Sequence, residues 1–290
     1  MADFSGFVGT RGTSFIVNGK PIYLNGFNSY WSMMFAADYS TRNKVTDAFQ
    51  KASETGLNVA GIWAFDDGDH RPLQSSPGSC NEEVFKGLDF VIAKAQKLGI
   101  YMILSLMNNW KDYGGKDKVA YKDDPTILAW ELKNEPCCPS DPNGSSLQSI
   151  DNKHLLEIGL EGFYWESRQQ YNPNSNLDGT DFITNNQIPD IDFATIHLYP
   201  ESWLPSTNKT EAEQLAFVEK WIESHVLDSN AVLEKPIVIS EFGKSYKLEG
   251  YSLDKRNKYF QKIYDDVYNS ARLGGPFVGG LFWQLMTELK

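Results

Sequence analysis

The chain has 290 residues, of which 41% are hydrophobic, and a formal net charge of −11 at pH 7. This length is sufficient for one large core, so we expect residues 1–290 to form a single domain. The negative charge argues against nucleic acid or an anionic membrane as a partner, and no apolar run approaches the roughly 20 residues of a membrane-spanning helix.

The cysteines and the N-terminal residues bear on where the protein works. Cys80, Cys137 and Cys138 provide no disulfide framework, and the adjacent pair lacks the spacing of a metal site. The first residues lack the basic-then-apolar order of a signal peptide, so the protein is either intracellular or has lost its signal. The triplets that begin at Asn143 and Asn208 match the N-glycosylation pattern and favour secretion.

A strand-then-helix alternation runs along the whole chain. Apolar runs predict strands at 21–30, 57–65, 100–109, 126–135, 154–163, 193–199, 236–242 and 279–286. Helical spacing of apolar residues predicts a helix at 45–56, ended by Gly56, and another at 82–99, ended by Gly99. Eight strands in this alternation are typical of a (β/α)₈ TIM barrel.

The alternation weakens in three places. The 17-residue stretches 109–125 and 137–153 contain no apolar periodicity of helical length, although parallel neighbours need a crossover of about a dozen residues or more, usually with a helix. The chain also stops at Lys290, directly after the eighth strand. We therefore expect shortened third and fourth crossovers, no closing C-terminal helix, and barrel strand faces that are left exposed.

Two glutamates occupy matching positions in this pattern. Glu135 ends the apolar run ILAWELKNEP, and Glu241 lies near the end of KPIVISEFG. In a barrel of parallel strands, the carboxyl ends of the strands form the catalytic rim. Two carboxyl groups that face each other across a sugar-sized gap are the usual equipment for cleaving a glycosidic bond. Either residue alone is readily explained as a surface acid, but the pair at two strand ends favours catalysis.

Several aromatic and polar residues fall near the same predicted rim. His197 and Tyr199 share one face of their strand because side chains alternate along it. Taken alone, His197 is equally well explained by packing in the core, and so is Trp283. The other aromatic candidates are Trp283, Trp63, Trp31 and Trp110.

Nearly the whole chain resembles the plant endo-β-1,4-mannanases of glycoside hydrolase family 5. Long segments carry the resemblance, among them FVGTRGTSFIVNGKPIYLNGFNSYW, DDPTILAWELKNEP, GTDFITNNQIPDIDFATIHLYPESW, ISEFGKS and GGLFWQLM. The resemblance implies a TIM barrel that hydrolyses β-1,4-mannan, galactomannan or glucomannan with retained configuration. It implies no cofactor and no metal. A wall polysaccharide as substrate implies a secreted protein, extracellular or in the cell wall, whose signal peptide is not in this chain.

The resemblance also implies roles for individual residues. By position, Glu135 matches the family's acid/base and Glu241 its nucleophile. The residues around the cleaved sugar match Asn134, His197, Tyr199 and Trp283. The wall of the substrate cleft matches Trp63, Glu161 and Trp203.

The chain departs from the family pattern at several positions. Gly61 stands where the family has an arginine that braces the nucleophile, and a nearby cation lowers the pKa of a carboxyl group. Lys133 stands where the family has methionine, and on a regular strand it would point the same way as Glu135. Cys137 also replaces a family arginine, and the family has longer third and fourth connections.

These departures leave an alternative to mannan hydrolysis open. The chain is either an active mannanase or an inactive or truncated relative that only binds mannan through its aromatic cleft. The loss of the arginine and of the helices favours the second, whereas the presence of Glu135 and Glu241 favours the first. A cellulase or xylanase on the same fold is a weaker alternative, because the long matching segments resemble mannanases.

Overall fold

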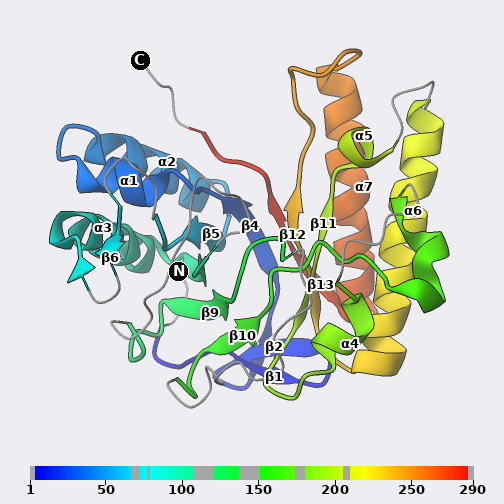
Figure 1. Cartoon of the computed structure of the whole chain (residues 1–290), viewed down its shortest axis with the longest axis horizontal. Coiled ribbons are helices and arrows are strands. Elements are labelled where there is room, and N and C mark those ends of the chain that lie inside the picture. The colour runs from blue at the N-terminus through cyan, green and yellow to red at the C-terminus, as the bar shows by residue number, and fades with distance from the viewer. Residues whose placement is uncertain are drawn as a thin grey trace.

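Eight parallel strands form the centre of the molecule. The computed structural model describes residues 4–66, 72–76, 79–107, 121–136, 151–173, 180–204 and 210–286. The strands are β4 (Leu24–Asn28), β5 (Val59–Trp63), β8 (Tyr101–Ser105), β9 (Ile127–Glu131), β10 (Leu155–Glu157), β11 (Ala194–Leu198), β12 (Ile237–Phe242) and β13 (Phe277–Phe282). They pair in the order β10-β9-β8-β5-β4-β13-β12-β11, which confirms the predicted barrel (Figure 1).

The barrel is nearly closed, with a seam between β10 and β11. Within the described ranges, these two strands are not joined by a ladder of backbone hydrogen bonds. Two single bonds cross the seam instead. The amide of Asp192 donates to the carbonyl of Leu156 at 2.9 Å, and the amide of His197 donates to the carbonyl of Glu161 at 2.9 Å.

The barrel interior is apolar, and its N-terminal end is plugged. Side chains such as Val59, Ile103, Val238 and Leu281 belong to one buried cluster inside the strands. A small antiparallel sheet of β1 (Gly9–Arg11), β2 (Ser14–Val17) and β3 (Lys20–Ile22) covers the lower end. From this sheet, Phe15 packs edge-on against a phenylalanine next to β11 with ring centres 5.1 Å apart. Functional groups are therefore left to the opposite, C-terminal end of the strands.

Helices cover two sides of the barrel. On one side lie α1 (Ser32–Ala37), α2 (Arg42–Glu54) and α3 (Glu82–Leu98), and on the other lie α6 (Glu211–Asp228) and α7 (Leu253–Arg272). Helix α3 begins after Asn81, whose side chain accepts the amide of Glu83, and ends at Gly99, which has a φ of 72°. The predicted helix 82–99 is thereby confirmed. The predicted helix 45–56 corresponds to α2, which begins three residues earlier.

Short elements fill the remaining connections. They are the hairpin β6 (Gln74–Ser76) and β7 (Ser79–Cys80), the 3₁₀ helix η2 (Glu166–Tyr171), α4 (Phe182–Asn186), α5 (Pro200–Trp203) and the π-helix η4 (Ser229–Leu233). Of the described residues, none forms a helix long and apolar enough to cross a membrane.

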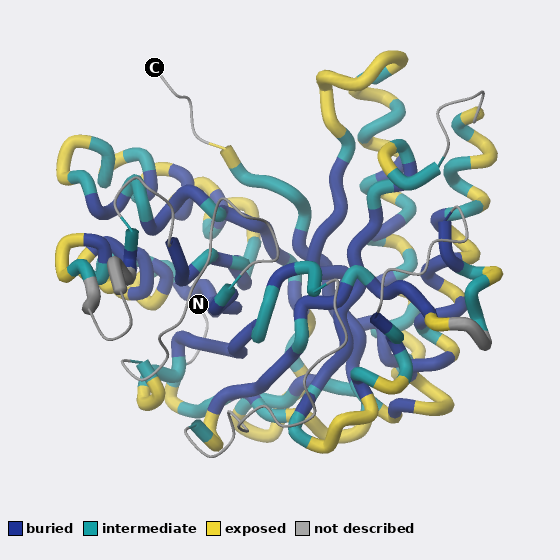
Figure 2. Tube along the Cα trace, viewed as in Figure 1, coloured by how far each residue is buried: buried dark blue, intermediate teal, exposed yellow. Residues whose placement is uncertain are grey.

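The third and fourth crossovers lack helices in their described parts, which are 106–107 and 121–126, and 132–136 and 151–154. The prediction that strand faces are therefore exposed is wrong for β9 and β10. Every residue of both strands is buried, as the dark tube of Figure 2 shows.

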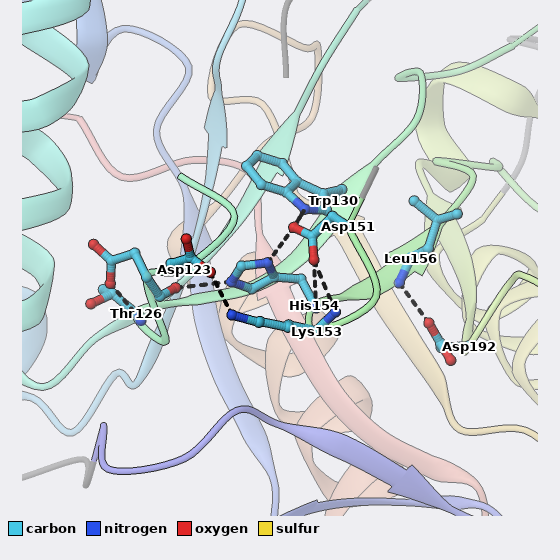
Figure 3. A network of polar contacts seen from close by, with 9 residues as sticks. Asp123, Thr126, Trp130, Asp151, Lys153, His154, Leu156 and Asp192 are labelled. Atoms are coloured by element: carbon cyan, nitrogen blue, oxygen red, sulfur yellow. Dashed lines mark hydrogen bonds and ion pairs between the residues drawn. The ribbon is translucent and has the colours of Figure 1, made fainter. Parts of the chain in front are cut away.

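A polar and aromatic network covers part of this region in place of helices (Figure 3). The indole N–H of Trp130, on the outer face of β9, donates to Asp151 at 2.8 Å. The ring of His154 bridges Asp151, at 2.6 Å, and the backbone carbonyl of Asp124, at 2.9 Å. Phe7, near the N-terminus, packs edge-on against His154 with ring centres 5.0 Å apart. A short loop thus buries Trp130 without a helix.

The outer face next to β13 is less well covered. Residues 283–286, the last described, form no helix. Between α2 and α7 lies an open groove of about 450 Å³. It is lined by Asn25, Lys51, Ala52, Thr55, Leu57, Tyr264, Phe282 and Leu285. This groove lies where a helix after the eighth strand of a complete (β/α)₈ barrel would pack.

Candidate active site

Glu241 lies inside strand β12, one residue before its end, and is buried. The hydroxyl of Tyr199 donates to its Oε2 atom at 2.7 Å. Nδ1 of His197 lies 3.8 Å from the same oxygen. His197 and Glu241 are paired neighbours on β11 and β12, which explains why their side chains meet.

Glu135 reaches the site from a loop rather than from a strand. Strand β9 ends at Glu131, so the predicted strand through residue 135 is four residues too long. Glu135 adopts a left-handed φ of 50°, which is uncommon for a residue with a side chain. Its amide donates to the carbonyl of Gly159 at 3.0 Å, and the amide of Asn134 donates to the carbonyl of Met107 at 2.9 Å. These bonds fix the turn that presents Glu135.

The two glutamates face each other beside His197. Nδ1 of His197 lies 3.0 Å from Oε1 of Glu135. One donor or acceptor atom from each of Glu135, His197 and Glu241 lies within 4.8 Å of the other two. Retaining glycosidases hold their carboxyl groups about 5–5.5 Å apart, whereas inverting enzymes separate them by about 6.5–9.5 Å. The geometry therefore corresponds to the retaining arrangement.

Charge in this cluster is shared between the two glutamates and the histidine. Burial lowers the pKa of His197, but the charges of Glu241 and Glu135 and a hydrogen bond to Glu135 outweigh it and raise the pKa to about 10. Burial raises the pKa of Glu241 to about 7, with a smaller increase from Glu135, while His197 and the bond from Tyr199 oppose the rise. His197 is thus a cation at neutral pH, next to two acids.

In the described parts of the chain, these same three residues form the group of side chains that could hold a metal ion. A protonated imidazole has no free lone pair for a metal. The raised pKa of His197 therefore favours acid–base chemistry over metal binding at this cluster.

An aromatic group stands on one side of the carboxylates. Trp283 follows β13 and stacks on Tyr30, with ring centres 5.8 Å apart and planes 11° apart. Trp63, at the end of β5, lies 5.2 Å from Tyr30 and 6.0 Å from Trp283. Tyr30 was not predicted from the sequence as a site residue, although it is the last residue of the predicted strand 21–30. All three are partly exposed and offer ring surface to a sugar.

The other predicted cleft residues come from the seam side of the barrel. Trp203, in α5, packs against Phe163 and Trp221 and lies edge-on to Tyr199 at 6.2 Å. Glu161 follows β10 and interacts electrostatically with His197. In strand order, Trp63 and Trp283 lie on one arc between the two glutamates, and Trp203 and Glu161 lie on the other.

Two other tryptophans do not join this group. Trp31 is buried, and its indole N–H donates to the carbonyl of Leu285 at 2.9 Å, so it belongs to the packing. Trp110 lies outside the described residues, as do Cys137 and Cys138.

Asn28 occupies the space in front of Gly61. A Cβ atom added at Gly61 would lie 2.2 Å from Oδ1 of Asn28. The side-chain Nδ2 of Asn28 donates to the carbonyl of Ser240, the neighbour of Glu241 on β12, at 2.8 Å. The sequence comparison identified the missing arginine at position 61, but it did not show that an asparagine from β4 fills the gap.

Lys133 does not pair with Glu135. The premise that both lie on one regular strand is wrong, because β9 ends at Glu131. The amide of Lys133 donates to the carbonyl of Ile158 at 3.2 Å. Among the ion pairs of the described residues, none joins Lys133 to either catalytic candidate.

Two buried acids below the site were missed by sequence reasoning. Glu131, at the end of β9, and Glu157, at the end of β10, both point into the barrel. The available signal was an acid inside each apolar run, since glutamates are almost never fully buried unless they have a partner.

Comparison with known proteins places this fold and site in one family. A model described as GH family 5 beta-mannosidase-like matches residues 5–119 and 116–287. The chain therefore belongs to glycoside hydrolase family 5, in its β-mannosidase-like group. The two matched parts meet at residues 116–119, inside the third crossover, which agrees with a shortened connection there.

Individual relatives are similar over almost the whole chain. Mannan endo-1,4-beta-mannosidase 1 of Arabidopsis thaliana is 49% identical over 340 aligned positions, which cover 98% of this chain and 83% of that protein. Mannan endo-1,4-beta-mannosidase 4 of Solanum lycopersicum is 48% identical, with coverage of 97% and 84%. Because 340 positions exceed the 290 residues of this chain by 50, at least 50 positions of the first alignment have no counterpart here.

Solved structures give the same assignment. The endo-1,4-beta-mannanase from Rhizomucor miehei has a TM-score of 0.76 and 27% identity, and the match covers 96% of this chain and 90% of that one. The hyperthermostable endo-1,4-beta-D-mannanase from Thermotoga petrophila has a TM-score of 0.73 and 26% identity, with coverage of 93% and 90%.

Proposed function

We propose that this protein hydrolyses internal β-1,4-mannosidic linkages in mannan, galactomannan or glucomannan with retained configuration. The observation that carries the proposal is the pair Glu135 and Glu241, whose carboxyl oxygens lie within 4.8 Å at the C-terminal rim of a family 5 barrel. The names of the relatives support the choice of mannan among the sugars that such a barrel cleaves.

In the proposed mechanism, Glu241 attacks the anomeric carbon while Glu135 donates its proton to the leaving glycosidic oxygen. A covalent mannosyl–enzyme forms, and the shortened polysaccharide leaves. Glu135, now ionised, takes a proton from water, which attacks the same carbon and releases Glu241. Two inversions at one carbon restore its configuration.

The surroundings of the two glutamates fit these roles. Tyr199 and cationic His197 stabilise the ionised form of Glu241, which the first step requires. Asn134 is buried directly beside Glu135, where its amide is within reach of a sugar hydroxyl. The rings of Trp283 and Trp63 on one arc and Trp203 on the other provide stacking surfaces along a cleft.

The decisive experiment is hydrolysis of galactomannan by the purified chain, with the anomeric configuration of the first products followed by NMR. We expect the α/β ratio of the new reducing ends to show that the anomeric carbon keeps its configuration. Glu241→Ala and Glu135→Ala should each abolish hydrolysis, while Glu223→Gln on the exposed surface of α6 should not. If the protein binds to a mannan gel but hydrolyses no mannan, the result would instead support an inactive, mannan-binding protein.

The substrate also indicates where the protein acts. A polysaccharide of plant walls is reached only outside the cell, so we propose that the protein is secreted, with no nucleic-acid or membrane partner. The two glycosylation triplets support this, although most of their residues lie outside the described parts of the chain. Expression with a signal peptide in a plant secretory system, followed by N-glycosidase treatment, tests it through a shift in mass.

A further inference from the structure

Glu131 and Glu157 form a buried pair of acids beneath the catalytic cluster. They are neighbours in register on β9 and β10, and both are almost completely shielded from solvent. The two acids influence each other, because the charge of Glu131 is one of the causes that raise the pKa of Glu157. A pair of apolar side chains would fill this space at lower cost, because buried ionisable groups pay a large desolvation penalty. The position of the pair therefore calls for a reason other than packing.

Each acid has a distinct set of additional partners. The hydroxyl of Ser105 on β8 donates to Oε1 of Glu131 at 2.6 Å. The hydroxyl of Thr195 on β11 donates to Oε2 of Glu157 at 3.0 Å. Glu157 thus connects β10 to β11 across the seam, where the strands lack a ladder.

A short path leads from Glu157 to the proposed acid/base. Oε2 of Glu157 accepts the amide of Gly159 at 2.5 Å, and the carbonyl of Gly159 accepts the amide of Glu135 at 3.0 Å. Gly159 has a φ of 85°, and a Cβ atom there would lie 2.2 Å from the carbonyl oxygen of Lys133. Gly159, whose carbonyl holds Glu135 in its left-handed turn, is therefore itself held through its amide by the carboxyl group of Glu157.

The pair also requires a proton. Oε1 of Glu157 is buried and receives no hydrogen bond from an N–H or an alcohol of the described residues. The neighbouring Glu131 can form a hydrogen bond with this oxygen only if one of the two acids is protonated, because carboxylates are acceptors only. Burial and mutual repulsion raise the pKa of Glu157 well above its usual value, and burial raises that of Glu131. The charged groups that face the pair are Glu135, His197 and Glu241.

We propose that Glu157 is a positioning residue for Glu135, acting through the Gly159 peptide, and that Glu157 and Glu131 share one proton in the folded enzyme. The first half rests on the proposed function, since it takes Glu135 as the acid/base. The second half does not depend on the proposed function: it rests on the register and burial of the two acids and on the Oε1 atom of Glu157 that has no partner among the described residues.

Three variants separate positioning from simple stability. Glu157→Gln keeps an acceptor for Gly159 and an N–H for Glu131, so we expect kcat on galactomannan within about three-fold of wild type. Glu157→Leu removes the acceptor and should lower kcat by about 10- to 100-fold with KM little changed, because small misplacements of a catalytic group are costly. Asp192→Leu is the matched control: it removes a partly buried acid that accepts the amide of Leu156, a neighbour of Glu157 on β10, at 2.8 Å and away from Glu135. Its kcat should remain at the wild-type value.

A second readout does not depend on activity. The amide of Glu135 should lose protection from hydrogen exchange in Glu157→Leu and keep it in Glu157→Gln and Asp192→Leu. An unchanged kcat and unchanged protection in Glu157→Leu, or equal losses in Asp192→Leu, would overturn the positioning role. If the wild-type chain hydrolyses no mannan, the proposed function fails, and the exchange data still decide whether Glu157 holds the Glu135 turn.

The shared proton is tested by melting temperature against pH, with a variant that preserves the hydrogen bonds. A glutamate with a raised pKa in the folded state stabilises the fold below its unfolded pKa, near 4.5, and loses that stabilisation as pH rises towards the folded pKa. Glu157→Gln needs no proton. The melting temperature of this variant relative to wild type should therefore increase between pH 5 and pH 8, by roughly 5 °C or more. A difference that is constant across this range would refute the shared proton, even if Glu157→Leu does not fold.

Discussion

The hydroxyl of Tyr199 donates a 2.7 Å hydrogen bond to Oε2 of Glu241, and it is the shortest polar contact that the structure gives this carboxyl group. Tyr199 lies two residues after His197, so β11 directs both an uncharged donor and a cation at the proposed nucleophile. Burial raises the pKa of Glu241 to about 7, and these two groups limit that rise. The ionisation of Glu241 therefore lies within the range of pH over which the enzyme is assayed.

The acid limb of the activity profile should report this ionisation. Because Glu241 must be ionised to attack, we expect kcat/KM to fall as pH drops below about 7. Tyr199→Phe removes a bond that lowers the pKa, so the limb should move upward by about one pH unit. The profile of kcat/KM from pH 4 to 9 measures this, with Tyr268→Phe on the exposed side of α7 as the control. If the acid limb does not move in Tyr199→Phe, the ionisation of Glu241 does not determine it.

Restoring a cation at position 61 should have the opposite effect. Gly61→Arg places a positive charge near β12, which lowers the pKa of Glu241 and moves the acid limb to lower pH. The side chain must first displace Asn28, so we also expect a loss of about 1–3 kcal/mol in unfolding free energy. Gly61→Met is the matched control, since it displaces Asn28 without adding charge. Equal profiles for the two variants would show that charge at position 61 has no influence on the nucleophile.

Lys133→Met should leave the pH profile of hydrolysis unchanged. Lys133 makes no ion pair with Glu135 among the described residues, and the regular strand that would have aligned the two side chains ends before both. The same pH series checks this expectation. An upward shift of the basic limb in Lys133→Met would instead mean that the ammonium group lowers the pKa of Glu135 in the working enzyme.

The groove between α2 and α7 should bind a hydrophobic dye. Leu57, Tyr264, Phe282 and Leu285 line it, and exposed apolar surface of this kind favours dye binding and aggregation. Fusing an amphipathic helical segment after the last residue, so that its apolar face can cover the groove, should suppress the dye signal and raise the melting temperature.

A fusion of the same segment with its apolar residues changed to serine provides the control, and it should leave the dye signal in place. High dye binding by both fusions, or none by the chain alone, would show that the groove is not a weak point of the fold.

The sequence was sufficient to predict the barrel and part of its rim. Period-2 alternation placed His197 and Tyr199 on one face, and the structure brings both to Glu241. The same rule failed for Lys133 and Glu135, because a left-handed residue ends the alternation and depends on a carbonyl from the next strand, at Gly159. Local pattern carries no information about such a tertiary hydrogen bond.

Burial of the strands without covering helices was also beyond local pattern. Trp130 is covered because Asp151 and His154, more than 20 residues later, bond to it and pack over it. In sequence these residues read as part of a polar loop. The buried pair Glu131 and Glu157 was missed for a similar reason: each looks like an isolated acid until the register of β9 and β10 brings them together.

The seam between β10 and β11 also separates the proposed catalytic residues. Glu135 follows β9 and bonds to Gly159 after β10. On the other side of the seam, His197 and Glu241 lie on the paired strands β11 and β12, and Tyr199 directly follows β11. The distance between the carboxyl groups of Glu135 and Glu241, on which the stereochemical outcome depends, therefore spans this seam. Among the described strands of the barrel, β10 and β11 are the neighbours joined by isolated bonds rather than by a continuous ladder. A slight widening of the seam would turn a spacing suited to covalent attack by Glu241 into one that admits a water molecule. Retention of configuration therefore depends on how closely β10 and β11 are held together at the seam.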